Sequence, residues 1–589
     1  MTISWIYSLF YAVSIILLFT GLYLYKKSVN VMYGAVWIPL LLVLVSCYQT
    51  FVTAFLCFVN IPVNIVSVGC CNLLGSSYFL YTIWKKKEIQ KYKYEAIDII
   101  GYLCVIVLVL VFVKMRFGGP HLFLNYAAID PATHFKSALY IMDYQTVTAM
   151  YHSALNNALF MECFAPFTGV ELYYKLFLIS DMISFVIAGF LFFGLLRKQL
   201  TDRFLKIAGL VIVLLYMAGY PLNTEIFGFI YLGQSITIIA AIIILMDMYV
   251  DKEIKEWFDL GSVMILCAGL AVCYILFAPV TYFAIITCIF LYQRKNEKLI
   301  SWKTIRICLG VFLLPCLIGI YYTYFRIFNS GTTVSGAIVT EGGCYRDLYS
   351  DFLPLLPLAI VGIIRLYQKK KNRVFMYLCP YSIVFVGILF LKGMFQQVSS
   401  YYYYKTYSLI WLLLFVGMFY GILQIDKKSR LLIVSGFATW SMVFGICVTS
   451  FEEKVAVHNE MFCPSPKASA FVSIYSYNGY DLKNRGPYNP EKISLYQYVY
   501  KNLLTDSEKE NIPVVAYWED VYWYADITDQ YSVAYEALKE DARYVVVMTD
   551  DLSTDYIDNQ EYFDSLERVY ENEAGYVAKL PEHKKGESN

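Results

Sequence analysis

The feature that most constrains this chain is a series of about fourteen apolar segments, most of them close to the length of a bilayer-spanning helix. Of the 589 residues, 59% are hydrophobic and only 16% are charged, which is more apolar surface than a soluble domain needs. The sequence therefore predicts a polytopic all-α membrane protein. Its segments fall at residues 5–25, 32–56, 61–84, 96–114, 172–196, 204–220, 226–250, 259–275, 277–292, 305–325, 352–367, 374–391, 406–424 and 431–449.

Short clusters of Lys and Arg follow alternate segments, and this pattern predicts how the chain is oriented. Cytoplasmic loops of membrane proteins carry an excess of Lys and Arg. Placing the clusters in the cytoplasm puts the N-terminus, the loop at 115–171 and the tail after 450 outside, in a multi-pass protein of the cell membrane. The clusters are Lys26-Lys27, Lys85-Lys86-Lys87, Arg197-Lys198, Arg294-Lys295, Lys369-Lys370-Lys371 and Lys427-Lys428. The first segment lacks a basic n-region and a cleavage site, so we do not expect a cleaved signal peptide.

Charge and cysteine spacing exclude several classes of function. The formal net charge of +1 predicts no nucleic-acid partner. Most of the fifteen cysteines lie inside apolar segments, and no CxxC or Cys/His spacing indicates a zinc site. Cys163, Cys344 and Cys463 lie outside the segments. A disulfide between two of them is one possibility, and three free thiols is the other.

The tail at 451–589 has a different composition from the rest of the chain. It is acidic and rich in tyrosine, and it has no apolar run of spanning length. Apolar runs and amphipathic stretches alternate in it, which predicts a small extracytoplasmic α/β domain. The expected strands are Ile512–Tyr517 and Tyr544–Met548, the expected helices are Ile493–Leu504 and Tyr531–Lys539, and Met461–Asn489 is the expected linker.

The external loop at 115–171 gathers most of the titratable residues that could carry chemistry. Pro131 fits the first turn of a helix, Asp130 fits its N-cap, and an apolar stripe over 131–142 suits a helix in the membrane interface. Asp130 and His134 are four residues apart and would face the same side. The alternative is that Asp130 only caps the helix. The loop also holds His121, Asp143, His152 and Glu162.

This architecture resembles the GT-C superfamily of integral-membrane glycosyltransferases. The resemblance rests on many spans, an acidic residue near a membrane-parallel helix in a long external loop, and an external C-terminal domain, and it covers residues 96–450. The helices of 1–95 would be an N-terminal addition. The family takes a sugar from a polyprenyl-phosphate carrier at the outer face of the membrane. The resemblance implies that Asp130, within Asp130-Pro-Ala-Thr-His134, is the catalytic base or a metal-binding residue.

Further residues suit a reaction that transfers a sugar from a lipid phosphate. The transfer needs a base for the acceptor hydroxyl, and a cation or metal for the leaving phosphate. Asp130, with His134, is the expected base. Lys405 follows four tyrosines, Tyr401–Tyr404. These tyrosines are either an aromatic patch that contacts a lipid headgroup or an ordinary aromatic belt at the membrane interface. Other residues expected to bind substrate are Tyr404, Glu225, Arg326, Arg346 and, at another span mouth, Lys392.

The expected function is transfer of a sugar from a polyprenyl-phosphate donor to a cell-surface glycan, lipid or protein. A divalent cation, Mg²⁺ or Mn²⁺, is an optional cofactor, with Asp130 and Glu225 as its ligands. Glu225 belongs to a short external turn at 221–225, and Asp181 lies inside a span, where it should face a cavity or a polar partner. The alternatives are a transporter or flippase for a lipid-linked sugar, and a scaffold that displays its tail.

Overall fold

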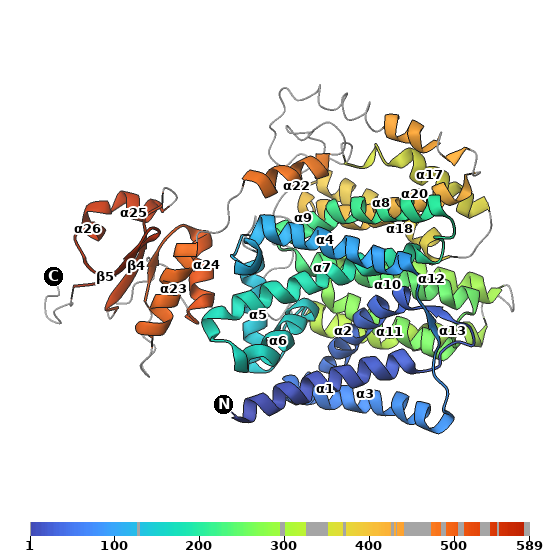
Figure 1. The fold of residues 1–589 in the computed structure, drawn as a ribbon, viewed down its shortest axis with the longest axis horizontal. Coiled ribbons are helices and arrows are strands. Elements are labelled where there is room, and N and C mark those ends of the chain that lie inside the picture. The colour runs from blue at the N-terminus through green and yellow to red at the C-terminus, as the bar shows by residue number, and fades with distance from the viewer. Residues whose placement is uncertain are drawn as a thin grey trace.

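The computed structural model describes residues 2–125, 130–294, 301–325, 351–368, 373–425, 429–430, 433–440, 473–484, 490–504, 512–530, 542–550 and 553–581. Within them, twelve helices are long and apolar enough to cross a membrane, so the chain is a polytopic all-α membrane protein. Figure 1 shows most of them as an aligned bundle. The first four are α1 (Thr2–Leu24), α2 (Gly34–Phe58), α3 (Ile65–Lys86) and α4 (Ala96–Phe117).

The remaining spans include several that are interrupted along their length. A break at Gly219 separates two helices, and a π-helical turn, η5 (Ile320–Phe325), ends another. The elements are α7 (Tyr173–Arg197), α8 (Arg203–Ala218), α9 (Tyr220–Phe227), α10 (Ile230–Asp251), α11 (Glu256–Cys273), η4 (Ile275–Phe277), α12 (Ala278–Arg294), α13 (Trp302–Gly319), α18 (Val374–Met394), α19 (Ser400–Lys405) and α20 (Tyr407–Gln424).

Two expected segments are missing from this set of twelve. The segment at 352–367 forms α17 (Leu356–Gln368), a helix of 13 residues, which is short for a span. It nevertheless packs tightly on α20, because a Cβ at Gly362 would collide with the backbone of Gly417. Of the segment at 431–449, the structure describes 433–440, which are helical.

The described basic clusters lie at one end of the bundle, which we call the basic end. There β1 (Met32–Tyr33) pairs in parallel with β2 (Tyr92–Lys93), and the Lys255 amide donates to the Lys27 carbonyl. Lys198 pairs with Glu253 at the same end. The helices therefore alternate in direction as the charge pattern predicts, and the N-terminus and the tail lie toward the opposite end (Figure 1).

The loop at 115–171 folds against that opposite end. It contains η1 (Gly119–His121), α5 (Asp130–Tyr144), α6 (His152–Phe164), η2 (Ala165–Phe167) and η3 (Val170–Leu172). The helix predicted at 131–142 is confirmed as α5, whose first residue is Asp130 itself. Its apolar stripe turns inward, since Phe135 is buried with its ring 5.4 Å from that of Phe177 on α7.

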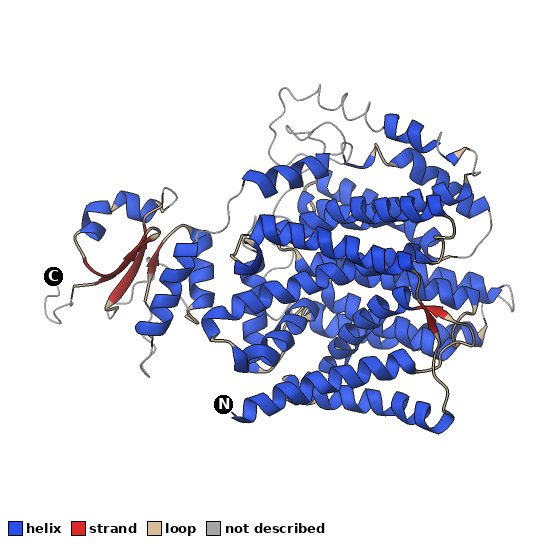
Figure 2. Ribbon diagram, viewed as in Figure 1, coloured by secondary structure: helices blue, strands red, loops and turns tan. Residues whose placement is uncertain are grey.

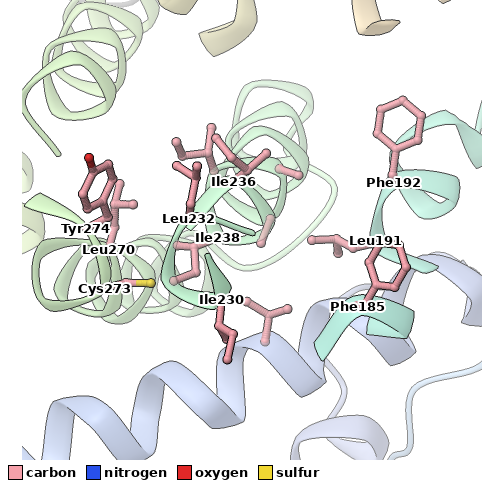
Figure 3. Close-up of a cluster of buried hydrophobic side chains, with 14 of the residues drawn as sticks. Phe185, Leu191, Phe192, Ile230, Leu232, Ile236, Ile238, Leu270, Cys273 and Tyr274 are labelled. Atoms are coloured by element: carbon pink, nitrogen blue, oxygen red, sulfur yellow. The ribbon is translucent and has the colours of Figure 1, made fainter. Parts of the chain in front are cut away.

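The interior of the bundle is built on α10, which is buried along most of its length between α7 and α11. Figure 3 shows the apolar side chains of these three helices facing one another, with Phe185 and Phe192 from α7, Ile230 and Leu232 from α10, and Leu270 from α11. The packing of α10 against α7 and α11 fixes the position of its first residue, Ile230. It therefore also fixes Phe229 and Tyr231, which lie at the end of the bundle opposite the basic end.

The tail contains a four-stranded sheet of strand order β3-β4-β6-β5 flanked by helices (Figure 2). The expected strand at 544–548 is confirmed as β4, which pairs in parallel with β3 and antiparallel with β6. The expected helix at 531–539 lies outside the described residues. The elements are α23 (Pro490–Asn502), β3 (Val514–Val515), α24 (Trp518–Ile527), β4 (Tyr544–Met548), α25 (Thr554–Asp558), α26 (Gln560–Asp564), β5 (Glu567–Asn572) and β6 (Gly575–Lys579).

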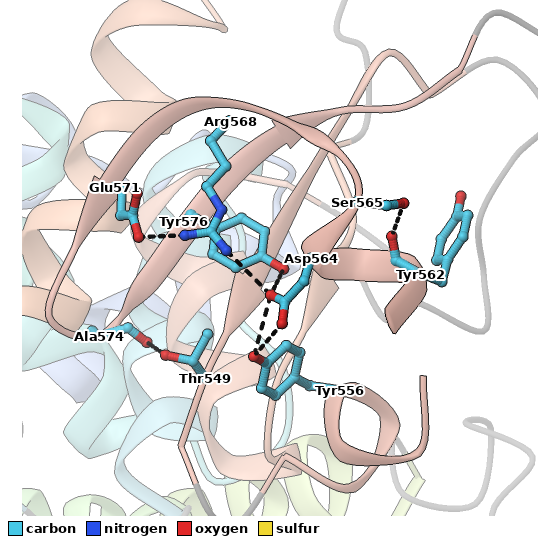
Figure 4. A network of polar contacts seen from close by, with 9 residues as sticks. All are labelled: Thr549, Tyr556, Tyr562, Asp564, Ser565, Arg568, Glu571, Ala574 and Tyr576. Carbon is cyan, nitrogen blue, oxygen red and sulfur yellow. Dashed lines mark hydrogen bonds and ion pairs between the residues drawn. The ribbon is translucent and has the colours of Figure 1, made fainter. Parts of the chain in front are cut away.

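A polar network fixes the β5–β6 hairpin, which the sequence did not predict, to α26. The Asp564 carboxylate accepts hydrogen bonds from the Tyr576 hydroxyl at 3.2 Å and from Arg568 at 3.2 Å. The Tyr556 hydroxyl of α25 also donates to it (Figure 4). Since β5 is mostly exposed on both faces, these side-chain contacts supplement a weak apolar pattern.

The segment expected as a linker, Met461–Asn489, contains a helix, α22 (Ser473–Asn484), that is docked on the bundle. Arg116 of α4 forms a buried ion pair of 2.9 Å with Asp481. The Asn478 amide donates to the carbonyls of Ala218 and Gly219, each at 2.9 Å. Because these contacts are polar, the segment lacks the apolar pattern by which a docked helix is recognised in sequence.

Candidate functional site

Three residues that the sequence marked separately meet at the end of the bundle away from the basic end. Asp130 and His134 come from α5 and Lys405 comes from the last turn of α19. They surround Tyr231, the second residue of α10. We call this group the Tyr231 cluster; it consists of Asp130, His134, Phe229, Tyr231, Tyr401 and Lys405.

Lys405 is the buried cation of the cluster. Its side chain is 0% exposed, and Nζ donates a hydrogen bond of 2.9 Å to the Tyr231 hydroxyl. Nζ also lies 3.0 Å from the ring centroid of Phe229 and 4.4 Å from that of Tyr401. Aromatic faces attract an ammonium, and more strongly once water is excluded. The three rings of Phe229, Tyr231 and Tyr401 therefore form an aromatic box around the charge.

His134 contacts the same tyrosine from α5. Its ring centroid lies 5.1 Å from that of Tyr231, in an edge-to-face arrangement. The imidazole is partly buried, and its Nε2 is shielded from solvent and has no hydrogen-bond partner. Burial, reinforced by the positive charge of Lys405, lowers the pKa of His134 to about 4. His134 is therefore neutral at pH 7.

Asp130 is partly exposed, as are His134 and Tyr231. Asp130 is the first residue of α5, where the helix dipole favours a negative charge. Its carboxylate interacts electrostatically with the side chain of Tyr231. The next residue, Pro131, packs so closely on Gly228 that a Cβ there would collide with it. Gly228 has φ +68°, a conformation that glycine adopts readily, so the turn between α9 and α10 fits under the start of α5.

Buried tyrosines connect the cluster to the docked helix α22. The Tyr404 hydroxyl donates a hydrogen bond of 3.1 Å to Oδ1 of Asn223. The side-chain amide of Asn223 in turn donates a hydrogen bond of 3.0 Å to Oδ1 of Asn478. Tyr401, Tyr403 and Tyr404 are all buried. These three tyrosines are therefore part of the protein interior. The sequence had instead suggested a patch that contacts a lipid headgroup or an aromatic belt at the membrane interface.

The structure separates Glu225 from the Tyr231 cluster. The expected external turn at 221–225 is wrong: Glu225 lies in α9 and is 4% exposed, because the chain turns into a helix at Gly219 rather than leaving the bundle. There its carboxyl group shares a hydrogen bond with Asp181 of α7. The expectation that Asp181 faces a polar partner inside the bundle is confirmed.

The other histidines of the loop do not join the cluster. His152 is buried beneath α2, where Nδ1 lies 2.7 Å from the Thr50 hydroxyl and Nε2 lies 3.2 Å from the Asn156 amide. His121 is exposed and stacks on Phe123 with ring centroids 5.3 Å apart. The tail aromatics also have structural contacts, since Trp523 packs on Phe135 of α5 and the Tyr524 hydroxyl donates to the Ile512 carbonyl.

Some expected site residues fall outside the described part of the chain, and some residues of the cluster were not expected. Arg326, Arg346, Cys344 and Cys463 are not among the described residues. Lys392 is exposed and donates to Gln397 at 2.6 Å. Tyr231 and Phe229 lie in an apolar segment, where nothing in a single sequence separates them from other span residues.

The cluster combines the carboxylate of Asp130, which can accept a proton, with the buried ammonium group of Lys405. A partly exposed carboxylate close to a buried positive charge is suited to deprotonating a hydroxyl while negative charge develops nearby. For a metal, the described residues offer no group of three or more His, Cys, Asp or Glu side chains that could hold one. Neither the known protein-family models nor the curated proteins contain a match to this chain.

Proposed function

We propose that this protein is a membrane glycosyltransferase that takes a sugar from a polyprenyl-phosphate donor and transfers it to a cell-surface acceptor. The observation that supports this most is the meeting of Asp130, His134 and Lys405 around Tyr231 at the end of the bundle away from the basic end. If the basic end is cytoplasmic, this cluster lies at the outer face of the membrane.

In the proposed reaction, Asp130 removes the proton from an acceptor hydroxyl. The hydroxyl oxygen then bonds to the anomeric carbon of the sugar as the bond from that carbon to the phosphate oxygen breaks. Polyprenyl phosphate leaves with the electron pair and one more negative charge. Lys405 stabilises that charge, since a positive charge acts strongly at low dielectric. Direct contact with the phosphate requires the aromatic box to open.

Neutral His134 has a positioning role in this scheme. Because its pKa is about 4, it adds no second positive charge beside Lys405 at neutral pH. Its ring holds that of Tyr231, which accepts the hydrogen bond from Lys405. The cluster therefore keeps a single buried cation at a fixed place next to a single accessible carboxylate.

The test is a transfer assay with membranes that contain the full-length protein. Polyprenyl-phosphate hexoses labelled in the sugar are added one at a time, and label is followed from the lipid extract into glycan, glycolipid or protein. We expect one donor to lose label in proportion to the amount of protein present. Label that stays on the carrier, but moves to the other leaflet, would favour the flippase instead.

One observation favours that second candidate, a transporter or flippase. The paired carboxyl groups of Asp181 and Glu225 lie within membrane-spanning segments, beside the break at Gly219. Broken helices with polar groups at membrane depth are typical of transporters. The transfer assay separates the two functions, because a flippase leaves the bond between sugar and phosphate intact.

A further inference from the structure

A second polar site lies inside the bundle, between α7, α9 and α10. Asp181 and Glu225 face a cavity of about 20 Å³ that Ser184, Thr224 and Gln234 also line. Both carboxyl groups are almost fully buried, with exposures of 0% and 4%. A cavity of this size holds one water molecule or one small ion.

Two hydrogen-bond acceptors in this site have no donor in the protein. They are Oε2 of Glu225 and Oε1 of Gln234, and the Gln234 side chain is 9% exposed. The side-chain amide nitrogen of Gln234 already has a partner, since it donates a hydrogen bond of 3.1 Å to the Ser184 hydroxyl. The carbonyl oxygen of Gln234 therefore faces a site that contains carboxyl oxygens and hydroxyl groups. A buried acceptor without a donor costs free energy.

The charges of the site are also unbalanced. A hydrogen bond between two carboxyl groups requires a proton on one of them, because an ionised carboxylate only accepts. The pair carries one negative charge whenever the other carboxyl group is ionised. Among the described residues that line this cavity, none is Lys, Arg or His. An uncompensated charge at membrane depth is costly, so the site calls for a positive charge from outside the protein.

We propose that Asp181 and Glu225, together with the carbonyl oxygen of Gln234, bind one hard divalent cation. The cation takes the place of the proton that the two carboxyl groups share, and that proton is released. Two carboxylates then balance the charge of the ion, and the hydroxyls of Thr224 and Ser184 are within the same lining. All of these ligands are oxygen atoms, a donor set that suits Mg²⁺, Mn²⁺ or Ca²⁺ rather than a thiophilic metal.

A wider pocket lies beside this site. It has a volume of about 420 Å³ and lies between α1, α2, α6, α7 and α10. Ser184, Gln234 and Thr237 line both the pocket and the small cavity. Its wall also carries the polar side chains of Gln49, His152 and Asn156 among mostly apolar ones. The small cavity therefore adjoins a wider pocket, and the lining of neither includes a residue of the Tyr231 cluster.

The experiment uses the purified full-length protein in detergent after dialysis against EDTA, and it needs no enzymatic activity. Mn²⁺, Mg²⁺ and Ca²⁺ are added separately in weak buffer at constant ionic strength. We expect a saturable rise in the thermal unfolding midpoint together with the release of protons. Glu225→Gln and Asp181→Asn should each weaken the apparent affinity at least about tenfold.

Asp259→Asn is the matched control, because Asp259 is another buried carboxyl group in a span and lies on α11. It should leave both cation responses unchanged. A wild-type protein that shows neither response overturns the proposal without reference to any variant. So does a response that survives in both Glu225→Gln and Asp181→Asn, or one that Na⁺ produces equally well. The transfer assay is independent, so either proposal can fail alone.

Discussion

At the scale of single residues, the environment of a side chain decides what it can do. Lys405 appeared in the sequence to lie at the membrane surface, yet aromatic rings enclose it completely. A buried ammonium is tolerated there because Tyr231 accepts its hydrogen bond and three ring faces replace part of its hydration. Burial lowers the pKa of the neighbouring His134, and the positive charge of Lys405 adds to this effect.

His134 should make the stability of the protein depend on pH. Its pKa is about 4 in the folded protein and near the ordinary 6.5 once unfolded. The unfolded chain therefore binds more protons between these values, and stability falls as the pH falls from 7 toward 4. The loss from this residue is about 2 kcal/mol at pH 5.

The thermal unfolding midpoint of His134→Phe, measured from pH 7 to pH 5, checks this. The variant should lose less stability than the wild type over that range, because Phe does not titrate. His121→Phe is the control, since His121 is exposed and should leave the curve of the wild type unchanged. Parallel curves for wild type and His134→Phe would contradict the lowered pKa of His134.

At the scale of elements, the helices with strong apolar patterns were predictable and the polar contacts between them were not. The apolar stripe over 131–142 predicted both ends of α5 to within two residues. The three helices α10, α11 and α12 lie where the apolar segments at 226–292 predict them. In contrast, no apolar pattern marks the polar contacts that hold α22 on the bundle through Asn478 and Asp481. Such contacts depend on partners more than two hundred residues away, which no local pattern records.

The buried pair of Arg116 and Asp481 should be important for holding α22 on the bundle. Asp481→Ala removes the carboxylate and leaves the guanidinium buried at 0% exposure, which should cost about 3 to 5 kcal/mol. We expect a lower unfolding midpoint and faster proteolysis within α22. The double variant Arg116→Met, Asp481→Leu should recover most of the loss, because it removes both charges. Equal instability of the single and double variants would show that the ion pair is not the cause.

At the scale of the whole molecule, the alternation of basic clusters predicted the relative direction of the helices. The structure confirms that Lys27, Lys198 and Lys255 belong to one end, and that the tail lies toward the other. The convergence on Tyr231 was only partly predictable. Asp130, His134 and Lys405 were identified by type and by position near span ends, but their contact depends on how α5, α10 and α19 pack.

The orientation of the whole molecule in the membrane can be tested with introduced cysteines. Glu561 is exposed on α26 in the tail, and Lys86 is exposed at the basic end. An impermeant thiol reagent should label Glu561→Cys on intact cells and Lys86→Cys only after lysis, with the unmodified protein as background. The reverse pattern would place the Tyr231 cluster in the cytoplasm and remove the basis for transfer at the outer face.

The most direct test of the proposed function is the transfer activity of Asp130→Asn. Asn has nearly the size and shape of Asp, so α5 should survive and the protein should be produced at normal levels. Asn cannot accept the proton, and we expect transfer to fall by at least about a hundredfold, as it should in Asp130→Ala. Asp143→Asn changes an exposed carboxylate on the same helix and should keep full activity. A well-folded Asp130→Asn protein that transfers sugar at the wild-type rate would contradict the assignment of this cluster as the active site.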